Sequence, residues 1–325
     1  RDNGAGLVGS EMCIRDSLMQ RGIETYEAAK TFFRPSLDDL HDPFLMQDMD
    51  KAVARIETAF LQNENILVYG DYDVDGTTSV ALVSSYLKTR TDSVATYIPD
   101  RYDEGYGISY KGIDFAHDND FSLIIALDCG VKAVDKVAYA KEHNIDFIIC
   151  DHHRPASELP NAVAVLDPKR EDCEYPYKEL CGCGVGFKLI QAMASKEGKT
   201  AKDLVEYLDL VATAIGADIV PITGENRALA YFGLQIINSN PRPGIKTIIA
   251  EVKKEELTIT DVVFIVAPRI NAAGRMKHGN HAVTLLTETD FNLAAEYAVD
   301  IEQFNTDRRE ADKRITEEAL KQIEE

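Results

Sequence analysis

The sequence GDYDVDG, residues 70–76, places Asp71, Asp73 and Asp75 at alternate positions directly after the apolar run ILVY. Three carboxylates spaced in this way and followed by a glycine match the start of an EF-hand calcium loop. The rest of that loop does not fit, because the twelfth position from Asp71 is Leu82 instead of a bidentate glutamate, and NILVYG is typical of a buried strand. The pattern therefore favours a carboxylate cluster at the carboxyl end of a parallel strand.

Acidic residues also end two other apolar runs. LIIALD ends in Asp128, and DFIICD ends in Asp151, which is followed by His152 and His153. Taken alone, DHH would suit an N-cap aspartate followed by surface histidines. Ligands of open α/β sheets bind outside the carboxyl ends of the strands, however, so these groups should converge with the first aspartates in one crevice.

Such convergence requires a cation among the acidic side chains. Two carboxylates about 4 Å apart repel by roughly 4 kcal/mol at an effective dielectric near 20. Oxygen ligands with one or two imidazoles suit Mn²⁺ or Mg²⁺. Asp218, which follows the apolar helical stretch LVATAIGA, is a further candidate ligand because an aspartate in apolar company is seldom left unpaired.

Two other patterns do not support the chemistry that they suggest at first. GCGVGFK fails the phosphate-loop pattern because Lys188 precedes Leu189, so its glycines are expected to allow close packing at a helix start or to form a backbone anion site. Cys173, Cys181 and Cys183 contain no C-x-x-C pair, so their spacing does not favour zinc.

The elements that position these residues follow from the alternation of apolar runs with helical patterns. Segments such as TTSVALVSSYLKTR and VKAVDKVAYAKEHN have helical spacing, and the first should begin with Thr77 or Thr78 as its N-cap. This order predicts βαβ repetition and an α/β fold, in which helices cover both faces of a parallel sheet. The expected strands are residues 65–70, 94–99, 123–128, 146–151 and 162–167.

Composition sets wider bounds on the class of protein. The chain has 325 residues, of which 45% are apolar, so it can bury a large core. It has no run of 18 apolar residues, so no membrane partner is expected. Six scattered cysteines indicate a reduced, cytoplasmic protein. The net charge of −20 argues against holding duplex DNA by bulk electrostatics, although it allows a local cationic groove.

The two ends of the chain differ from the middle. Residues 1–17 have neither regular periodicity nor a signal-peptide pattern, and we interpret them as a non-native leader. Residues 305–325 form a charged, strongly helical run without a C-cap, which predicts a long connecting helix that is cut.

Four motifs, DYDVDG, LDCG, DHH and GADIVP, resemble in their order the metal motifs of the DHH phosphoesterases. The stretches FRPSLDDLHDPFLMQDMDKAVARI, IPDRYDEGYGI, CGCGVGFKL and APRINAAGRM are similar to signatures of the bacterial single-strand exonucleases of that family. The resemblance covers about residues 20–325. It implies a helical segment at 18–63, a DHH domain at 64–222 and a helical extension at 223–325, without the associated and OB-type domains that follow in such exonucleases.

The resemblance implies two metal ions, Mn²⁺ or Mg²⁺. Asp128 would bridge them and share the catalytic role with Asp73 and Asp75. The first site would contain Asp71, Asp73 and Asp128, and the second would contain Asp75, Asp128, His152 and Asp218. Four residues before Asp73, many relatives have a histidine ligand where this chain has Tyr69, so the first site should be looser and Asp71 or water must complete it.

The substrate would meet a second set of residues. By resemblance, His153 would act in catalysis by facing the scissile phosphate. Arg101 would grip a 5′-phosphate through its planar guanidinium, the alternative being a surface ion pair with Asp103 or Glu104. The segment 269–281 would contact the strand backbone, the alternative being a solvated loop. The residues expected to do so are Arg269, Asn271 and Arg275.

The implied activity is metal-dependent hydrolysis of single-stranded DNA from the 5′ end, releasing 5′-mononucleotides in DNA repair and recombination. A single-strand-binding protein and a helicase would be partners. The alternative is a DHH phosphodiesterase for short oligonucleotides or cyclic dinucleotides, but the signatures EGYG and PRINAAGRM favour the exonuclease. A non-catalytic scaffold would lose metal carboxylates, and this chain keeps them.

Overall fold

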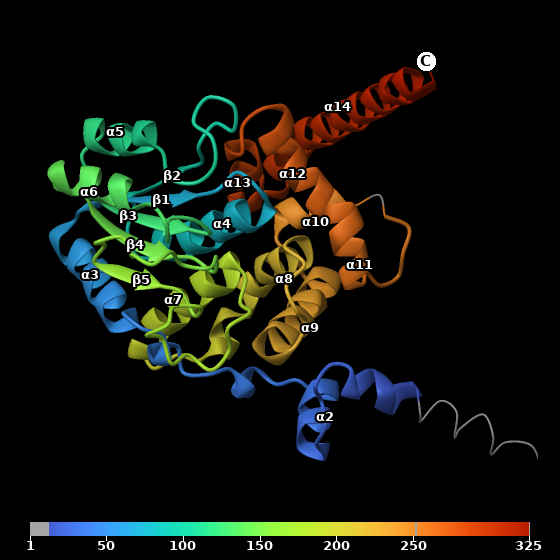
Figure 1. Cartoon of the computed structure of the whole chain (residues 1–325), viewed down its shortest axis with the longest axis horizontal. Coiled ribbons are helices and arrows are strands. Elements are labelled where there is room, and N and C mark those ends of the chain that lie inside the picture. Colours follow the sequence, from blue (N-terminus) through green and yellow to red (C-terminus); the bar gives the residue numbers. More distant parts are fainter. Residues whose placement is uncertain (1–12, 251, 325) are drawn as a thin grey trace, which may run out of the picture.

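A parallel sheet of five strands lies at the centre of the computed structural model, which describes residues 13–250 and 252–324 (Figure 1). The strand order is β2-β1-β3-β4-β5. The predicted α/β fold is confirmed, and each of the five expected strands is present, in most cases one to three residues shorter than expected. The strands are β1 (Asn65–Gly70), β2 (Val94–Tyr97), β3 (Phe121–Leu127), β4 (Asp146–Cys150) and β5 (Ala164–Leu166).

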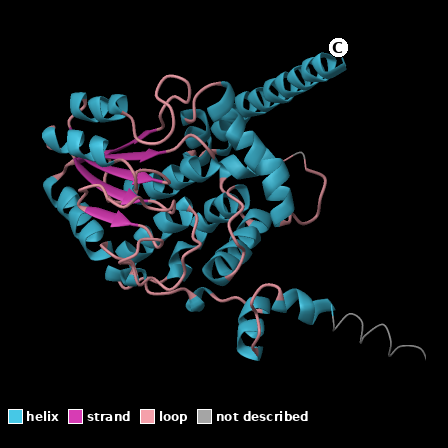
Figure 2. Cartoon of the chain, in the orientation of Figure 1, coloured by secondary structure: helices cyan, strands magenta, loops and turns pink. Residues whose placement is uncertain are grey.

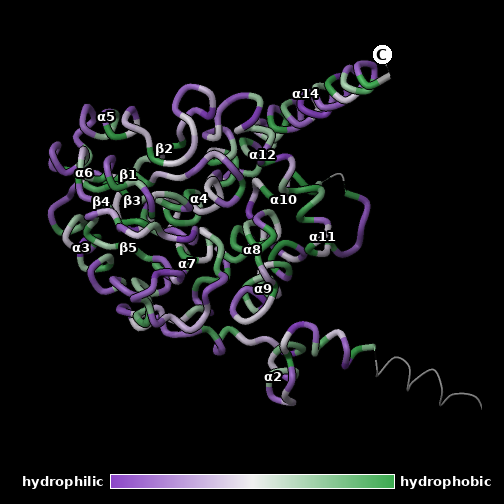
Figure 3. The backbone as a smooth tube through the Cα atoms, in the orientation of Figure 1, coloured by the Kyte–Doolittle hydropathy of each residue, from purple (hydrophilic) through white to green (hydrophobic). Residues whose placement is uncertain are grey.

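Helices cover both faces of this sheet (Figure 2). In β1, Ile66 and Val68 belong to one apolar core and Leu67 and Tyr69 to the other, because successive side chains of a strand point to opposite faces. Helices α3 (Met49–Gln62), α4 (Val74–Lys88) and α7 (Gly182–Lys196) pack on the first face, and α5 (Tyr110–Asp118) and α6 (Val134–Glu142) on the second. The apolar runs of the strands are therefore buried on both sides. Figure 3, which colours the chain by hydropathy, shows green, apolar stretches of tube in this central part of the molecule.

The remaining described residues are mostly helical. Before the sheet lie α2 (Tyr26–Phe33) and two short 3₁₀ turns, Leu37–Asp39 and Pro43–Leu45. After it, a 3₁₀ turn at Ala201–Tyr207 leads into the later helices, which include a π-helical turn at Val262–Val266. These helices are α8 (Leu208–Ala217), α9 (Gly224–Ser239), α10 (Pro243–Ile249), α11 (Ile259–Asp261), α12 (Ala267–Met276), α13 (Asn280–Thr287) and α14 (Phe291–Glu324). The far end of α14 projects from the body of the molecule (Figure 1).

The start of α4 differs from the prediction. The helix begins at Val74, and its N-cap is Asp73 instead of Thr77 or Thr78: Oδ1 of Asp73 accepts a hydrogen bond from the Gly76 N–H at 3.0 Å. The threonines predicted as caps, Thr77 and Thr78, instead return their hydroxyls to carbonyls of the preceding turn. Of the predicted metal ligands, Asp73 is thus the N-cap of α4 and Asp75 lies in its first turn, whereas Asp71 precedes the helix.

The predicted boundaries at residues 18, 64 and 223 stay predictions. Residues 1–12 of the predicted leader lie outside the described part of the chain. Within that described part, no helix combines the length and the apolar character needed to cross a bilayer.

Candidate metal centre at the carboxyl edge of the sheet

The acidic motifs meet at one edge of the sheet. Gly70 of β1 is in register with Leu127 of β3, and Leu127 with Cys150 of β4, so the residues that follow these strand ends emerge side by side. Asp128 takes the left-handed conformation at φ 58°, which an aspartate tolerates better than a β-branched residue. The predicted convergence is therefore confirmed for Asp128 and the DHH motif.

Asp75 is held by the amino terminus of α7. Its Oδ2 accepts the Gly182 N–H at 2.6 Å, and its Oδ1 accepts the Cys183 N–H at 2.8 Å. The first two residues of GCGVGFK, Gly182 and Cys183, thus form a backbone anion site, and the anion is a side chain of the protein. Close packing also accounts for Gly182, since a Cβ there would lie 2.6 Å from Cβ of Asp128.

His152 lies at the middle of the acidic cluster. Its Nε2 is 3.1 Å from Oδ1 of Asp128, 3.7 Å from Oδ2 of Asp75 and 3.6 Å from Oδ2 of Asp218. Burial, with the neighbouring charge of His153, lowers the pKa of His152 to about 4. The imidazole is therefore neutral at pH 7, the form that binds metals. Asp75, His152 and Asp218 offer donor atoms close enough to hold one ion, as do Asp128, His152 and His153.

The carboxylates raise one another's pKa. Burial first, then the charges of Asp218 and Asp73, raise the pKa of Asp75 to about 8, and burial with the charge of Asp75 raises that of Asp128 well above its usual range. Burial and the charge of Asp73 raise the pKa of Asp218 to about 6. The cluster is therefore unfavourable as a set of bare anions, and protons or a cation must relieve it.

The expected first site is less complete. Asp71 is buried, and neither of its carboxylate oxygens has a hydrogen-bond partner among the residues that the structure describes. Burial and the charge of Asp73 raise its pKa to about 7. Buried carboxylate oxygens without partners fit a cation, so Asp71 suits the supporting role predicted for it. Among the described residues, however, Asp71 and Asp73 do not join a group of three donors.

Tyr69 takes no part in this donor set. Its ring is fully buried between β1 and α5, on the face of the sheet that carries the second core. Its hydroxyl donates to the Gly107 carbonyl at 2.9 Å and accepts the Ser109 N–H at 3.1 Å. At the position where the resemblance implies a histidine ligand in many relatives, this chain thus has a residue that anchors the loop between β2 and α5.

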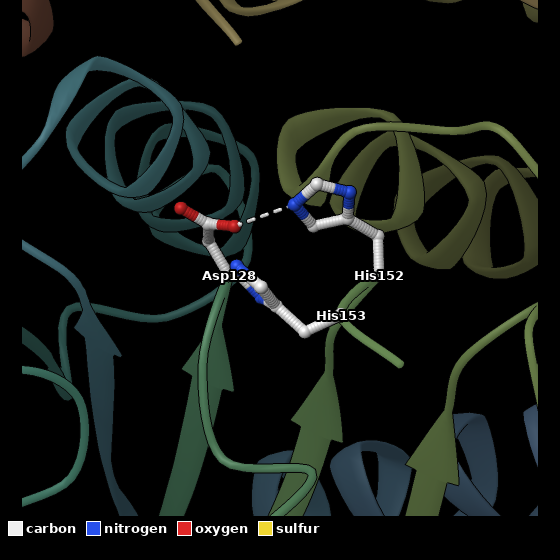
Figure 4. A group of neighbouring side chains, drawn as sticks. All are labelled: Asp128, His152 and His153. Carbon is white, nitrogen blue, oxygen red and sulfur yellow. Dashed lines mark ion pairs between the residues drawn. The ribbon is translucent and has the colours of Figure 1, made fainter. Parts of the chain in front are cut away.

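His153 is held by Asp151 and faces the same crevice. The Nδ1 atom of His153 is 2.7 Å from Oδ1 of Asp151, and this hydrogen bond raises the pKa of the imidazole. Both imidazoles reach toward Asp128 from the end of the adjacent strand (Figure 4). With His152 buried, the alternative of an N-cap followed by two surface histidines is wrong.

Arg101 does not make the surface ion pair considered as its alternative. Its guanidinium stacks on the ring of Tyr72, 4.5 Å from the centroid, while Lys111 pairs with Asp103. Glu104 accepts a hydrogen bond from the Tyr97 hydroxyl at 2.9 Å. The Arg101 side chain is thus available to an anion.

The segment 269–281 is largely helical, so the alternative of a solvated loop is wrong for residues 269–276, which lie in α12. Asn271 lines a cavity of about 170 Å³ together with Asp73, Asp75 and Asp218. Arg269 instead pairs with Glu302 at 2.6 Å, away from that cavity. The predicted substrate roles of Asn271, Arg269 and Arg275 stay predictions.

Three residues near the site were not given a role from the sequence. Asp151 appeared as a strand-end acid, but its role as the partner of His153 depends on the fold. The hydroxyl oxygen of Tyr106, within EGYG, lies 3.2 Å from Nε2 of His153. Asp167 follows β5, is fully buried and has one carboxylate oxygen without a partner. Its position after the apolar run AVAVL was a usable signal.

Comparison with known proteins identifies the family and several relatives of this chain. Residues 65–215 match the family described as "DHH family, N-terminal domain". The chain is 40% identical over 313 residues to the single-stranded-DNA-specific exonuclease RecJ of Bacillus subtilis, a match that covers 96% of this chain and 39% of the relative. It is 34% identical to the RecJ of Haemophilus influenzae, covering 88% of this chain and 52% of the relative. The chain spans about half the length of such curated relatives.

Solved structures agree with these sequence matches. The fold is similar to the crystal structure of exonuclease RecJ bound to manganese, with a TM-score of 0.78 and 30% identity over 85% of this chain and 70% of that one. RecJ of Thermus thermophilus in complex with Mn²⁺ gives a TM-score of 0.79 at 27% identity, covering 94% of this chain and 43% of that one.

Proposed function

Because this chain belongs to the DHH family and to its RecJ group, we propose that it hydrolyses phosphodiester bonds at the 5′ end of single-stranded DNA and releases 5′-mononucleotides. The observation that carries the proposal is the convergence of three carboxylates on the neutral imidazole of His152. Such a donor set suits a divalent cation of the Mn²⁺ or Mg²⁺ type. We propose two ions, with Asp128 between them.

The chain's own residues prepare the site for that chemistry. Bound divalent cations supply Lewis acidity toward a phosphate and a water. The N-terminus of α7 fixes Asp75, and Asp151 fixes the His153 ring. The hydrogen bond to Asp151 raises the pKa of His153 and so favours its imidazolium form. In that form the ring can donate a hydrogen bond to phosphate oxygens, whose charge grows in the transition state.

The preference for a 5′ end is assigned to Arg101. A guanidinium binds a terminal phosphate, which carries more charge than an internal phosphodiester, through two parallel hydrogen bonds. Stacking on Tyr72 leaves the donor edge of Arg101 free and holds the side chain beside the Asp71–Asp75 motif.

The test uses a short oligonucleotide labelled at either end and incubated with Mn²⁺. We expect mononucleotides from the 5′ end, loss of activity in Asp128→Ala, and at least a hundredfold loss in His153→Ala. Arg101→Ala should reduce the preference for a 5′-phosphate over a 5′-hydroxyl more than it slows turnover of the bound strand. Digestion from the 3′ end, or equal rates on both 5′ ends in the unmutated protein, would show that the chain acts on short oligonucleotides in another way.

The biological setting belongs to the same proposal. The activity serves DNA repair and recombination, with a single-strand-binding protein and a helicase supplying the unpaired strand. Five of the six cysteines are buried and all of them are free, which suits a reducing compartment such as the bacterial cytoplasm. Co-purification from a cell extract with and without nuclease treatment would separate direct partners from proteins held by DNA.

A further inference from the structure

The loop between β2 and α5 carries a tyrosine into the metal crevice. Tyr106 lies between Gly105 and Gly107, whose φ angles of 83° and 78° are in the left-handed region that favours glycine. The backbone on each side of Tyr106 thus has a positive φ, which most other residues rarely adopt. The Tyr106 ring contacts the rings of Tyr72 and His153.

This loop is fixed from beneath. The buried hydroxyl of Tyr69 donates to the Gly107 carbonyl and accepts the Ser109 N–H, so it holds the loop on both sides of Ile108. Glu104 accepts hydrogen bonds from the Asp100 N–H at 2.8 Å and from the Tyr97 hydroxyl at 2.9 Å. Tyr106 is thus a partly exposed side chain on a loop that buried groups hold in place.

The Tyr106 hydroxyl meets the nitrogen of His153 that Asp151 leaves free. It lies 3.2 Å from Nε2, while Nδ1 is 2.7 Å from Asp151. The two rings also pack edge to face, with centroids 6.1 Å apart. On its other side Tyr106 packs against Tyr72, which carries the guanidinium of Arg101. Both nitrogens of His153 are therefore held, one by a carboxylate and one by a phenol.

We propose that Tyr106 is a positioning residue: in the free protein its hydroxyl holds Nε2 of His153 and keeps the ring turned into the crevice, and the scissile phosphate replaces the hydroxyl at Nε2 when the strand binds. Through Tyr72, Tyr106 also ties His153 to the Arg101 subsite. The inference rests on the proposed function. Tyr106 acts through His153, so its contribution should vanish when the imidazole is absent. A hydrogen bond from a neutral group is worth roughly a factor of ten at most, which sets the size of the effect.

The test is a double-mutant cycle with Tyr106→Phe and His153→Gln, read on a 5′-phosphorylated oligonucleotide and on thymidine 5′-(p-nitrophenyl phosphate), both with Mn²⁺. Tyr106→Phe alone should lower kcat about 3- to 10-fold with little change in KM. In the His153→Gln background, the same change should have no further effect. Tyr102→Phe is the matched control, because Tyr102 lies on the same loop but its hydroxyl donates to the Arg275 carbonyl.

Additive losses in the cycle would overturn the proposal, as would a raised KM with an unchanged kcat, which would mark Tyr106 as a binding contact only. A readout without activity keeps the two proposals apart. In metal-free protein labelled with ¹⁵N-histidine, Tyr106→Phe should move the Nε2 resonance of His153, assigned by its absence in His153→Gln, and Tyr102→Phe should not. If the unmutated protein cleaves neither substrate, the proposed function fails, and an unmoved Nε2 resonance would separately overturn the role of Tyr106.

Discussion

Asp218 is the most exposed of the three carboxylates around His152: 31% of its side chain is accessible, against 3% for Asp128 and 2% for Asp75. Unlike Asp75, it has no helix N-terminus to balance its charge. Asp218 follows the last residue of α8, where the helix dipole disfavours an anion. It should therefore depend on a cation more than its neighbours do.

Asp218→Asn should separate repulsion from metal binding. In metal-free buffer at pH 8, the variant should melt about 1–3 °C higher than the unmutated protein, because a charge in the acidic cluster is removed. Saturating Mn²⁺ adds roughly 2.7 kcal/mol to the free energy of unfolding at about 100 times Kd, and most of this gain should be lost in the variant. Differential scanning fluorimetry measures both. A full Mn²⁺ shift in Asp218→Asn would contradict the ligand role, and Asp300→Asn on α14 is the control.

Asp167 should make stability depend on pH. Its Oδ1 accepts the Lys169 N–H at 2.7 Å, its Oδ2 has no partner, and burial raises its pKa to about 7. The folded protein keeps this proton where the unfolded chain has released it, so the stabilising contribution present below about pH 4 is lost as the pH rises through 7. Asp167→Asn should thus be more stable than the unmutated protein at pH 8 by about 2–5 °C, and no more stable at pH 5.

The comparison is made as the difference between the two melting temperatures at each pH, so that the carboxylates of the metal centre cancel. A difference that does not change between pH 5 and pH 8 would mean that the buried carboxyl group is not the source of the effect.

Most of the acidic donors could be predicted from the sequence because they follow apolar runs, and the strand ends of a parallel sheet share one edge. It did not reveal hydrogen-bond partners. That Asp75 binds the start of α7, or that Tyr69 anchors a loop instead of a metal, depends on groups brought together only by the fold.

The geometry of the metal centre depends more on the position of helix α7 than on that of any other element. A Cβ on Gly182 would lie 2.6 Å from Cβ and 2.7 Å from Oδ1 of Asp128, so α7 would have to move and release Asp75. Gly182→Ala should therefore weaken Mn²⁺ binding at least tenfold, measured by calorimetry, and destabilise the protein by about 1–3 kcal/mol.

Gly184→Ala is the control within the same helix, because a Cβ there would lie 3.3 Å from the nearest atom, on the flexible side chain of Leu180. Equal Mn²⁺ affinity in both variants would show that the backbone of α7 does not fix the ligands.

The elements themselves were more predictable than their ends. Buried strands are apolar runs, which a sequence displays directly. The N-cap of α4 was placed four or five residues late, at Thr77 or Thr78 instead of Asp73, because Asp73 serves both as N-cap and as expected ligand. A sequence does not show that one side chain has two roles. Residues 269–276 were not assigned to a helix, although α12 packs its alanines against the body of the molecule.

Across the whole molecule, the net charge of −20 limits how a strand is held. For a single strand, the logarithm of the binding constant falls with the logarithm of the salt concentration by about 0.7 per phosphate contacted. With about three cationic contacts, affinity for a short single strand should therefore fall roughly 20-fold between 50 and 200 mM salt. Gel-shift titration of the Asp128→Ala variant with a 5′-phosphorylated 12-mer checks this. An affinity insensitive to salt would point to stacking on exposed aromatic rings as the main source of binding, and digestion by the active protein should release the strand after each cut.

The hydrogen bonds from Gly182 and Cys183 to Asp75 join residues 107 and 108 positions apart. His152 and the three carboxylates around it come from four separate segments of the chain. Closing loops of that length is slow, and a folding nucleus forms from nearer contacts first. The ion can then bind only after the transition state has passed. Mn²⁺ should therefore leave the folding rate in the refolding limb of a chevron plot unchanged and lower the unfolding rate. The bound metal would then slow the unfolding of a chain that has already folded without making it fold faster.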